Sequence, residues 1–137
     1  MDATLLTPFD FHPSTRVIFG EGALERLGEL ARELAFHRTL IVADRGIVAT
    51  GQVDRAASLL EAVGSVPFFF HDFDANPDTA MIDAGRSHAA ASAIDSIVAI
   101  GGGSSLDCAK GINFLVTNGG QMRDYWGFGK ASRPMLP

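Results

Sequence analysis

The strongest constraint on the fold of this chain is an alternation of short apolar runs with longer runs of helical periodicity. Residues 39–43 (TLIVA), 66–70 (VPFFF) and 96–100 (SIVAI) are largely apolar and lack the regular polar alternation of a half-exposed strand. Runs of this kind are typical of strands that are covered on both faces, as in a parallel sheet. Residues 15–19 (TRVIF) are predicted as a further strand.

The segments between these runs carry apolar residues at helical spacing. We expect helices over residues 23–34, 52–63, 76 to about 91, and 105–116. Asn76 is predicted to cap the third of these, with Pro77 at its first position. For the fourth, we expect Ser104 as the cap with Asp107 as its capping-box partner, and Leu106 on the buried face. Alternating strands and helices predict an α/β fold, with a parallel sheet and helices on both faces.

Length, charge and cysteine content limit the classes of function. The 137 residues suffice for one domain, which we expect to span residues 1–137. Sixteen acidic and 11 basic residues give a formal charge of −5, a poor match for nucleic acid. No run reaches the roughly 18 apolar residues of a membrane span, and residues 1–6 do not resemble a secretion signal. The single cysteine, Cys108, fits a reducing compartment, so we expect a cytoplasmic protein.

The clearest candidate for a ligand site is the glycine turn Gly101-Gly102-Gly103, which lies between a predicted strand and a predicted helix. Such a turn leaves backbone N–H groups free at the positive end of a helix dipole, where a phosphate or pyrophosphate can bind. The alternative is a tight turn with no ligand, although three successive glycines exceed what a turn requires. The motif is not a P-loop, because no Gly-Lys-Ser/Thr follows it, nor is it the usual dinucleotide fingerprint.

Asp44 is the second candidate, since it follows the predicted strand 39–43. Ligands of parallel sheets collect at this end of the strands, where a carboxylate could accept hydrogen bonds from a ribose and repel a 2′-phosphate. The alternative is an aspartate that serves the turn. Asp72 and Asp74 could form a carboxyl pair, although their position before Asn76 favours a role in the turn.

Other polar and aromatic residues give weaker signals. The four histidines are scattered without ligand spacing, so we expect no metal site within the chain. A helix dipole could lower the pKa of Cys108, but burial as a small side chain is the favoured interpretation. Residues 125–129 (YWGFG) form an aromatic loop that either folds over something or packs on the surface.

Four segments together resemble the iron-containing (group III) alcohol dehydrogenase family. Residues 101–110 (GGGSSLDCAK) are similar to the family's GGGSxxDxAK signature. Residues 19–24 (FGEGAL), residues 40–47 (LIVADRGI) and the Asn76-Pro77 pair occur in the matching order. The resemblance implies a Rossmann-like nucleotide-binding domain, followed in the family by an all-helical domain that holds a divalent metal.

The resemblance also implies roles for individual residues. The implied cofactor-binding residues are Asp44, Asn76, Gly101, Gly102, Gly103 and Ser104. The glycines and Ser104 would hold the pyrophosphate, Asn76 would line the cofactor cleft, and Asp44 would contact the adenosine ribose. A carboxylate at that position favours NAD over NADP.

The family's activity is hydride transfer between a small alcohol or aldehyde and NAD, with Fe²⁺ or another divalent metal as Lewis acid. Its metal ligands, one aspartate and three histidines, belong to the helical domain, and none of those positions falls within these residues. We therefore expect the chain to end before that domain, to contain no catalytic residue and to be inactive alone. We also expect a homo-oligomer such as a dimer, with residues near Phe9 and Phe11 offering a means of pairing with a neighbour.

Two alternatives remain open. One is a non-catalytic, stand-alone nucleotide- or phosphate-binding module. The other is a relative within the same superfamily, such as a maleylacetate reductase, a glycerol dehydrogenase or a dehydroquinate synthase.

Overall fold

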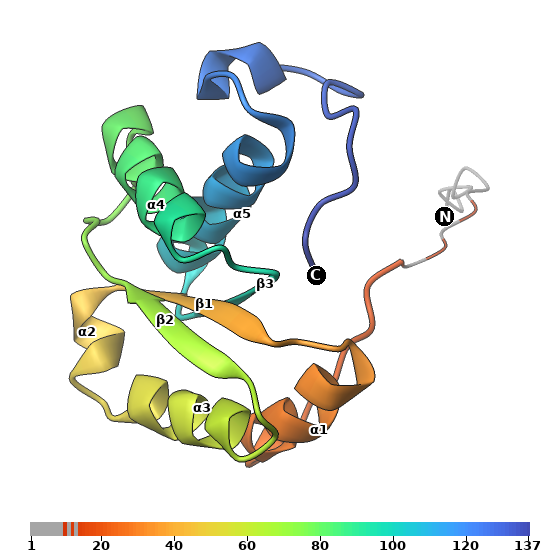
Figure 1. Ribbon diagram of the computed structural model, residues 1–137, viewed down its shortest axis with the longest axis vertical. Coiled ribbons are helices and arrows are strands. Elements are labelled where there is room, and N and C mark those ends of the chain that lie inside the picture. The colour runs from red at the N-terminus through yellow and green to blue at the C-terminus, as the bar shows by residue number, and fades with distance from the viewer. Residues whose placement is uncertain (1–9, 11, 13) are drawn as a thin grey trace, which may run out of the picture.

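A three-stranded parallel sheet lies at the centre of the structure (Figure 1). Its strands are β1 (Arg38–Ala43), β2 (Val66–Phe70) and β3 (Ser96–Ile100), in the order β2-β1-β3. The structure is a computed structural model that describes residues 10, 12 and 14–137, so Phe9 and Phe11 lie outside the described residues. The predicted strands 39–43, 66–70 and 96–100 are thereby confirmed.

Helices cover both faces of the sheet (Figure 1). On one face lie α1 (Leu27–Glu33) and α3 (Gln52–Glu61), and on the other lie α4 (Thr79–Ala91) and α5 (Gly103–Asn118). Three short elements complete the described part: the 3-10 helices η1 (Ala23–Arg26) and η2 (Met122–Tyr125), and the one-turn helix α2 (Arg45–Val48). The α/β class with helices on both faces is therefore confirmed.

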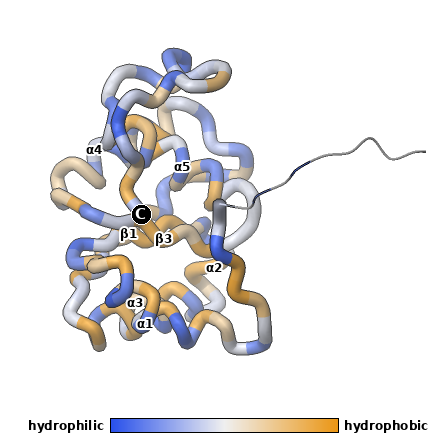
Figure 2. The backbone as a smooth tube through the Cα atoms, turned by 90° about the vertical axis from the view of Figure 1, so that its right-hand side faces the viewer, coloured by the Kyte–Doolittle hydropathy of each residue, from blue (hydrophilic) through white to orange (hydrophobic). Residues whose placement is uncertain are grey.

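The core consists of two apolar layers separated by β1. Leu40 and Val42 face α4 and α5, whereas Ile41 and Ala43 face α1 and α3. All four side chains are fully buried, and the tube is hydrophobic where β1 and β3 cross the middle of the molecule (Figure 2). A strand that supplies both layers cannot alternate with polar residues, which explains its unbroken apolar sequence.

The predicted strand at residues 15–19 is wrong. No strand of the described part pairs with this segment, and its Val17 and Phe19 are 79% and 100% exposed. The segment instead reaches α1 through an ion pair of 2.8 Å between Arg16 and Glu33. A segment rich in strand-forming residues forms a strand only beside a partner strand with which its backbone can hydrogen-bond. For this segment, composition alone therefore predicted a strand that the structure does not contain.

The predicted caps of the two helices α4 and α5 are also wrong. Asp78 caps α4, accepting a hydrogen bond of 2.9 Å from the Met81 N–H, whereas Asn76 lies two residues earlier. Helix α5 begins at Gly103 after Gly102, without a side-chain cap, so Ser104 and Asp107 form no capping box.

Leu106 is 43% exposed rather than buried. Its position on α5 falls beside the buried stripe of that helix, which consists of Ser105, Cys108, Ala109, Gly111, Ile112 and Leu115. This stripe follows the i, i+3, i+4, i+7 spacing of one helix face, and Leu106 is one residue out of step with it.

Asp95 connects the beginnings of β1 and β3. Its Oδ1 accepts hydrogen bonds from the backbone N–H groups of His37 (3.1 Å) and Arg38 (3.0 Å) and from the hydroxyl of Ser96 (2.9 Å). Partial burial pushes the pKa of Asp95 upward, but the hydrogen bonds from Arg38, His37 and Ser96 outweigh it and hold this pKa below its ordinary value. The ionised carboxylate therefore stabilises the folded sheet.

We predict that Asp95→Asn lowers the free energy of unfolding by about 1 kcal/mol at neutral pH, since the partly exposed carboxylate is screened by water. A group whose pKa is depressed by folding contributes stability above its unfolded pKa and loses it as the pH falls through its folded pKa. The difference between wild type and Asp95→Asn should therefore shrink on acidification, as measured by urea unfolding at several pH values. Asp83→Asn, at an exposed position on α4, is the control. A difference that stays constant with pH would contradict this prediction.

Candidate functional site

The candidate site lies where the carboxyl ends of β1 and β3 meet. The chain passes from β1 to β2 on one side, and then crosses to β3 on the other side of β1. Such a reversal of direction is a topological switch point, where parallel α/β sheets open a crevice for ligands. Asp44 directly follows β1 and Gly101 directly follows β3, so two of the predicted site residues flank this point.

The three glycines of the turn differ in their surroundings. Gly101 has a φ of +137°, and a Cβ added to it would lie 2.7 Å from the Ser105 Oγ and 3.3 Å from the Ile47 Cγ1. A Cβ added to Gly102 or Gly103 would meet nothing within 4 Å, and both residues are exposed. Packing thus requires glycine at position 101, whereas Gly102 and Gly103 leave open space above the backbone.

The N-terminus of α5 opens onto this space. Its first N–H groups, at Gly103, Ser104 and Ser105, precede the first residue that can bond within the helix. The helix is 16 residues long, so these donors also lie at the positive end of its dipole. The donors at the exposed Gly103 and the half-buried Ser104, beside open glycines, favour an anion with several oxygens, such as a phosphate or pyrophosphate.

Asp44 has a structural role and also lies in the crevice. Its Oδ1 accepts a hydrogen bond of 3.0 Å from the Ile47 N–H and so caps α2, a helix that replaces the turn predicted after β1. Its other oxygen, Oδ2, lies 3.5 Å from the Ser105 hydroxyl. A carboxylate offers about four lone-pair positions, so the half-buried Asp44 can still accept hydrogen bonds from a ligand.

Asn76 comes to the same place from the loop between β2 and α4. Its backbone has the left-handed φ of +53°, and its N–H donates a hydrogen bond of 3.0 Å to the Ser104 Oγ. Asparagine adopts this left-handed conformation more readily than most residues, so the loop can turn here and bring its N–H to Ser104. The three loops after β1, β2 and β3 therefore meet, and they bring all six predicted site residues to one end of the sheet.

A pocket of about 370 Å³ lies between these loops. Its lining residues are Asp44, Arg45, Gly46, Phe73, Asp74, Ala75 and Ser104. Sequence reasoning missed Arg45, although its position directly after Asp44 was a usable signal.

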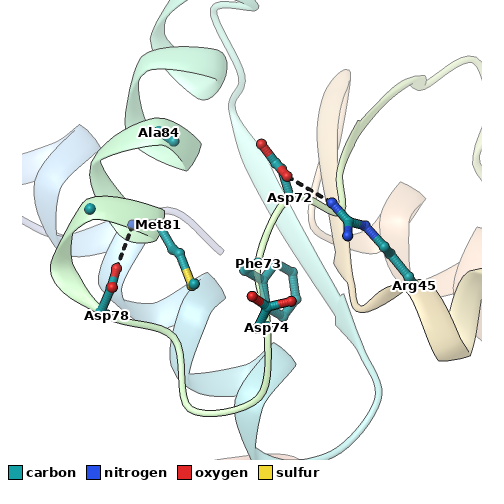
Figure 3. A pocket seen from close by; sticks show the side chains of 8 residues that line it. Arg45, Asp72, Phe73, Asp74, Asp78, Met81 and Ala84 are labelled. Carbon is teal, nitrogen blue, oxygen red and sulfur yellow. Dashed lines mark hydrogen bonds and ion pairs between the residues drawn. The ribbon is translucent and has the colours of Figure 1, made fainter.

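A second pocket, of about 340 Å³, adjoins the first along the loop before α4 (Figure 3). Arg45 reaches across it to Asp72 with a separation of 2.9 Å between Nη2 and Oδ1. This ion pair directs Arg45 toward Asp72, and it gives Asp72 a cation as its partner rather than a second carboxylate. Both side chains are largely exposed, so the pair orients Arg45 without adding much stability.

Cys108 lies on the buried face of α5. Burial raises the pKa of its thiol to about 11, so the favoured interpretation, a buried small side chain, agrees with the structure. The aromatic loop packs only in part: Tyr125 lies against Phe114, with ring centroids 5.1 Å apart, whereas Trp126 is 89% exposed and Phe128 is fully exposed.

Comparison of the chain with known proteins agrees with this geometry. The fold places the chain among the Rossmann-like α/β domains, which bind ligands at a switch point of this kind. The family model of iron-containing alcohol dehydrogenase matches residues 14–137, and the chain belongs to this family. The predicted resemblance is therefore confirmed.

Three relatives illustrate the match. Alcohol dehydrogenase 4 of Schizosaccharomyces pombe is 39% identical over 120 residues, which cover 88% of this chain and 28% of that protein. The crystal structure of 1,3-propanediol oxidoreductase superposes with a TM-score of 0.82 at 30% identity, over 86% of this chain and 31% of that one. Sulfoacetaldehyde reductase from Bifidobacterium kashiwanohense, solved in complex with NAD⁺, superposes with a TM-score of 0.78 at 27% identity, over 94% of this chain and 33% of that one.

The chain spans less than a third of the full length of curated relatives such as alcohol dehydrogenase 4. Within residues 10, 12 and 14–137, no three His, Cys, Asp or Glu side chains gather closely enough to hold a metal ion. The described residues therefore do not fit the iron of this family. In the same part of the chain, no helix is both long and apolar enough to cross a bilayer.

We predict that Cys108 resists modification in the folded protein, because a buried thiol with a pKa near 11 is almost entirely protonated at pH 8. A colorimetric thiol reagent should label the native chain at least about a hundredfold more slowly than the urea-unfolded chain. The unfolded sample, with one thiol per chain, sets the full signal. Rapid labelling of the native protein would contradict the burial of this residue.

Proposed function

We propose that this chain, residues 1–137, is the dinucleotide-binding domain of an NAD-dependent, iron-dependent alcohol dehydrogenase. One observation carries the proposal: the open N-terminus of α5, with Gly102 and Gly103 uncovered, lies at the switch point beside the carboxylate of Asp44. An anion site and a carboxylate within one crevice suit the pyrophosphate and the ribose of a dinucleotide. Family membership and the NAD⁺ complex of the sulfoacetaldehyde reductase support this reading.

In this proposal, each part of the cofactor has its own partner. The N–H groups at Gly102, Gly103 and Ser104 hold the pyrophosphate, and Gly101 lets the turn close beneath it. Asp44 accepts hydrogen bonds from the adenosine ribose, and Asn76 flanks the cleft from the loop before α4. When bound, NAD supplies the group that accepts or donates the hydride.

Asp44 also favours NAD over NADP, because its negative charge repels a phosphate on the 2′-oxygen. Arg45, the cation nearest in sequence, is ion-paired with Asp72 at 2.9 Å. A free arginine at such a position could instead accommodate the 2′-phosphate. The ion pair between Arg45 and Asp72 thus preserves the preference that Asp44 sets.

The reaction itself needs groups that the described residues do not bring together. In the proposed whole protein, the metal ligands lie in the helical domain that the resemblance implies, and a small alcohol or aldehyde binds between the two domains. We expect the 137-residue chain to bind NADH without oxidising alcohols. A homo-oligomer is part of the same proposal and rests on the resemblance, whereas the proposed cytoplasmic location rests on the single cysteine.

The glycine turn offers a matched pair of variants. We predict that Gly102→Ala leaves the melting temperature nearly unchanged, because its Cβ meets open space, yet lowers NADH affinity at least about tenfold by blocking the approach of the phosphates. Gly101→Ala should lower the free energy of unfolding by about 1–3 kcal/mol, since its Cβ collides with Ser105 and its φ is positive. Calorimetric titration and thermal unfolding measure the two effects. Unchanged NADH affinity in Gly102→Ala, or no affinity in the wild type, would leave the turn with a purely structural role.

Asp44→Asn tests the cofactor preference without removing the cap of α2, because the amide oxygen can still accept from the Ile47 N–H. We predict that the ratio of NADPH to NADH dissociation constants falls about tenfold, since the charge that repels the 2′-phosphate is gone. Titration of both cofactors into wild type and variant measures this ratio. Asp54→Asn, on the exposed face of α3, is the control. An unchanged ratio would show that Asp44 does not discriminate between the ribose of NADH and the 2′-phosphate of NADPH.

A further inference from the structure

We propose that Ser105 is a positioning residue that sets the cofactor preference by holding the carboxylate of Asp44. This inference rests on the proposed function, because it explains how the crevice distinguishes a ribose 2′-hydroxyl from a 2′-phosphate. It concerns the side chain of a residue that is not among the six predicted site residues, and it joins the helix that faces the pyrophosphate to the carboxylate that faces the ribose.

Ser105 is one of the buried polar residues of the described chain. Its side chain is fully buried in the first turn of α5, and a buried hydroxyl needs hydrogen-bond partners. The partners given by the structure both belong to Asp44, 61 residues away in sequence. The Ser105 Oγ accepts from the Asp44 N–H at 3.3 Å and donates toward the Asp44 Oδ2 at 3.5 Å.

The glycine turn is shaped around this hydroxyl. A Cβ at position 101 would lie 2.7 Å from the Ser105 Oγ and 3.2 Å from the Ser105 Cβ. No side chain larger than hydrogen fits at Gly101 while the hydroxyl keeps its place. Gly101 therefore serves the contact between Ser105 and Asp44 as well as the closure of the turn.

The carboxylate of Asp44 is held at both of its oxygens. The Ile47 N–H contacts Oδ1 at 3.0 Å, and the Ser105 hydroxyl contacts Oδ2 at 3.5 Å. The shorter contact with Ile47 anchors one oxygen, and the buried hydroxyl of Ser105 beside the other oxygen limits rotation of the carboxylate about that bond. Limited rotation keeps the negative charge close to the position of the ribose 2′-oxygen, where it discriminates most strongly between hydroxyl and phosphate.

The neighbouring serine has a different partner. The Ser104 Oγ accepts from the Asn76 N–H at 3.0 Å and so connects α5 to the loop before α4. Consecutive serines thus tie α5 to two different loops of the crevice. Ser105→Ala should change the discrimination between cofactors, whereas Ser104→Ala should weaken both cofactors by the same factor.

The experiment titrates NADH and NADPH into the 137-residue wild type, Ser105→Ala, Ser104→Ala and the exposed neighbour Leu106→Ala, each checked for folding by circular dichroism. We expect the ratio of NADPH to NADH dissociation constants to fall about fivefold in Ser105→Ala and to stay constant in the other two. Ser105→Cys fills the site with a weaker hydrogen-bond donor and should give an intermediate ratio. This variant replaces Ser105→Ala in the experiment if the alanine variant does not fold.

A double variant distinguishes an effect of Ser105 through Asp44 from a general loosening of the fold. If Ser105 acts through Asp44, the ratio in Asp44→Asn combined with Ser105→Ala should equal that in Asp44→Asn alone. Hydrogen exchange adds a readout that needs no cofactor, because loss of the hydroxyl should speed exchange of the Asp44 amide at least about tenfold.

The outcomes separate the two proposals. A wild type that binds neither cofactor overturns the proposed function, and the exchange rate of the Asp44 amide then decides whether Ser105 holds Asp44. A wild type that prefers NADH, with the preference lost in Asp44→Asn and kept in Ser105→Ala, overturns the role of Ser105 and leaves the proposed function standing. Additive effects in the double variant would likewise overturn it.

Discussion

The burial of β1 on both faces and along both edges is the constraint on which the rest of the structure depends. Leu40 and Val42 pack against one helical layer and Ile41 and Ala43 against the other, while β2 and β3 occupy the two edges. Because β1 is central, the chain must reverse direction to reach its second edge, and this reversal creates the switch point. The position of the crevice is thus a consequence of how the core is filled.

The same residues stabilise the loops and present groups to the crevice. Asp44 caps α2 while its carboxylate lies in the pocket, and Gly101 makes room for Ser105 while it closes the turn above β3. A substitution at Gly101, or one at Asp44 that removes the acceptor for the Ile47 N–H, therefore changes stability together with any binding. Gly102 lacks such packing contacts, since a Cβ added there meets nothing within 4 Å.

The sequence predicted those features that local composition determines. The buried strands follow from apolar runs, and the position of Asp44 at the end of β1 follows from the end of such a run. Features that depend on distant residues could not be predicted. Residues 15–19 have the composition of a strand but no partner in the described part, and the contact between Asp44 and Ser105 spans 61 residues. The start of α5 was missed because Gly102 caps it without a side chain, a position that serine occupies more often.

The central claim is that the crevice between β1 and β3 binds a dinucleotide, and amide chemical-shift mapping tests it most directly. Adding NADH to the ¹⁵N-labelled chain should shift the amides of Gly102, Gly103 and Ser104 most, followed by those around Asp44. Residues of the neighbouring surface near His71 and His88 should move little. Shifts concentrated at His71 and His88, or spread evenly without saturation, would contradict the claim.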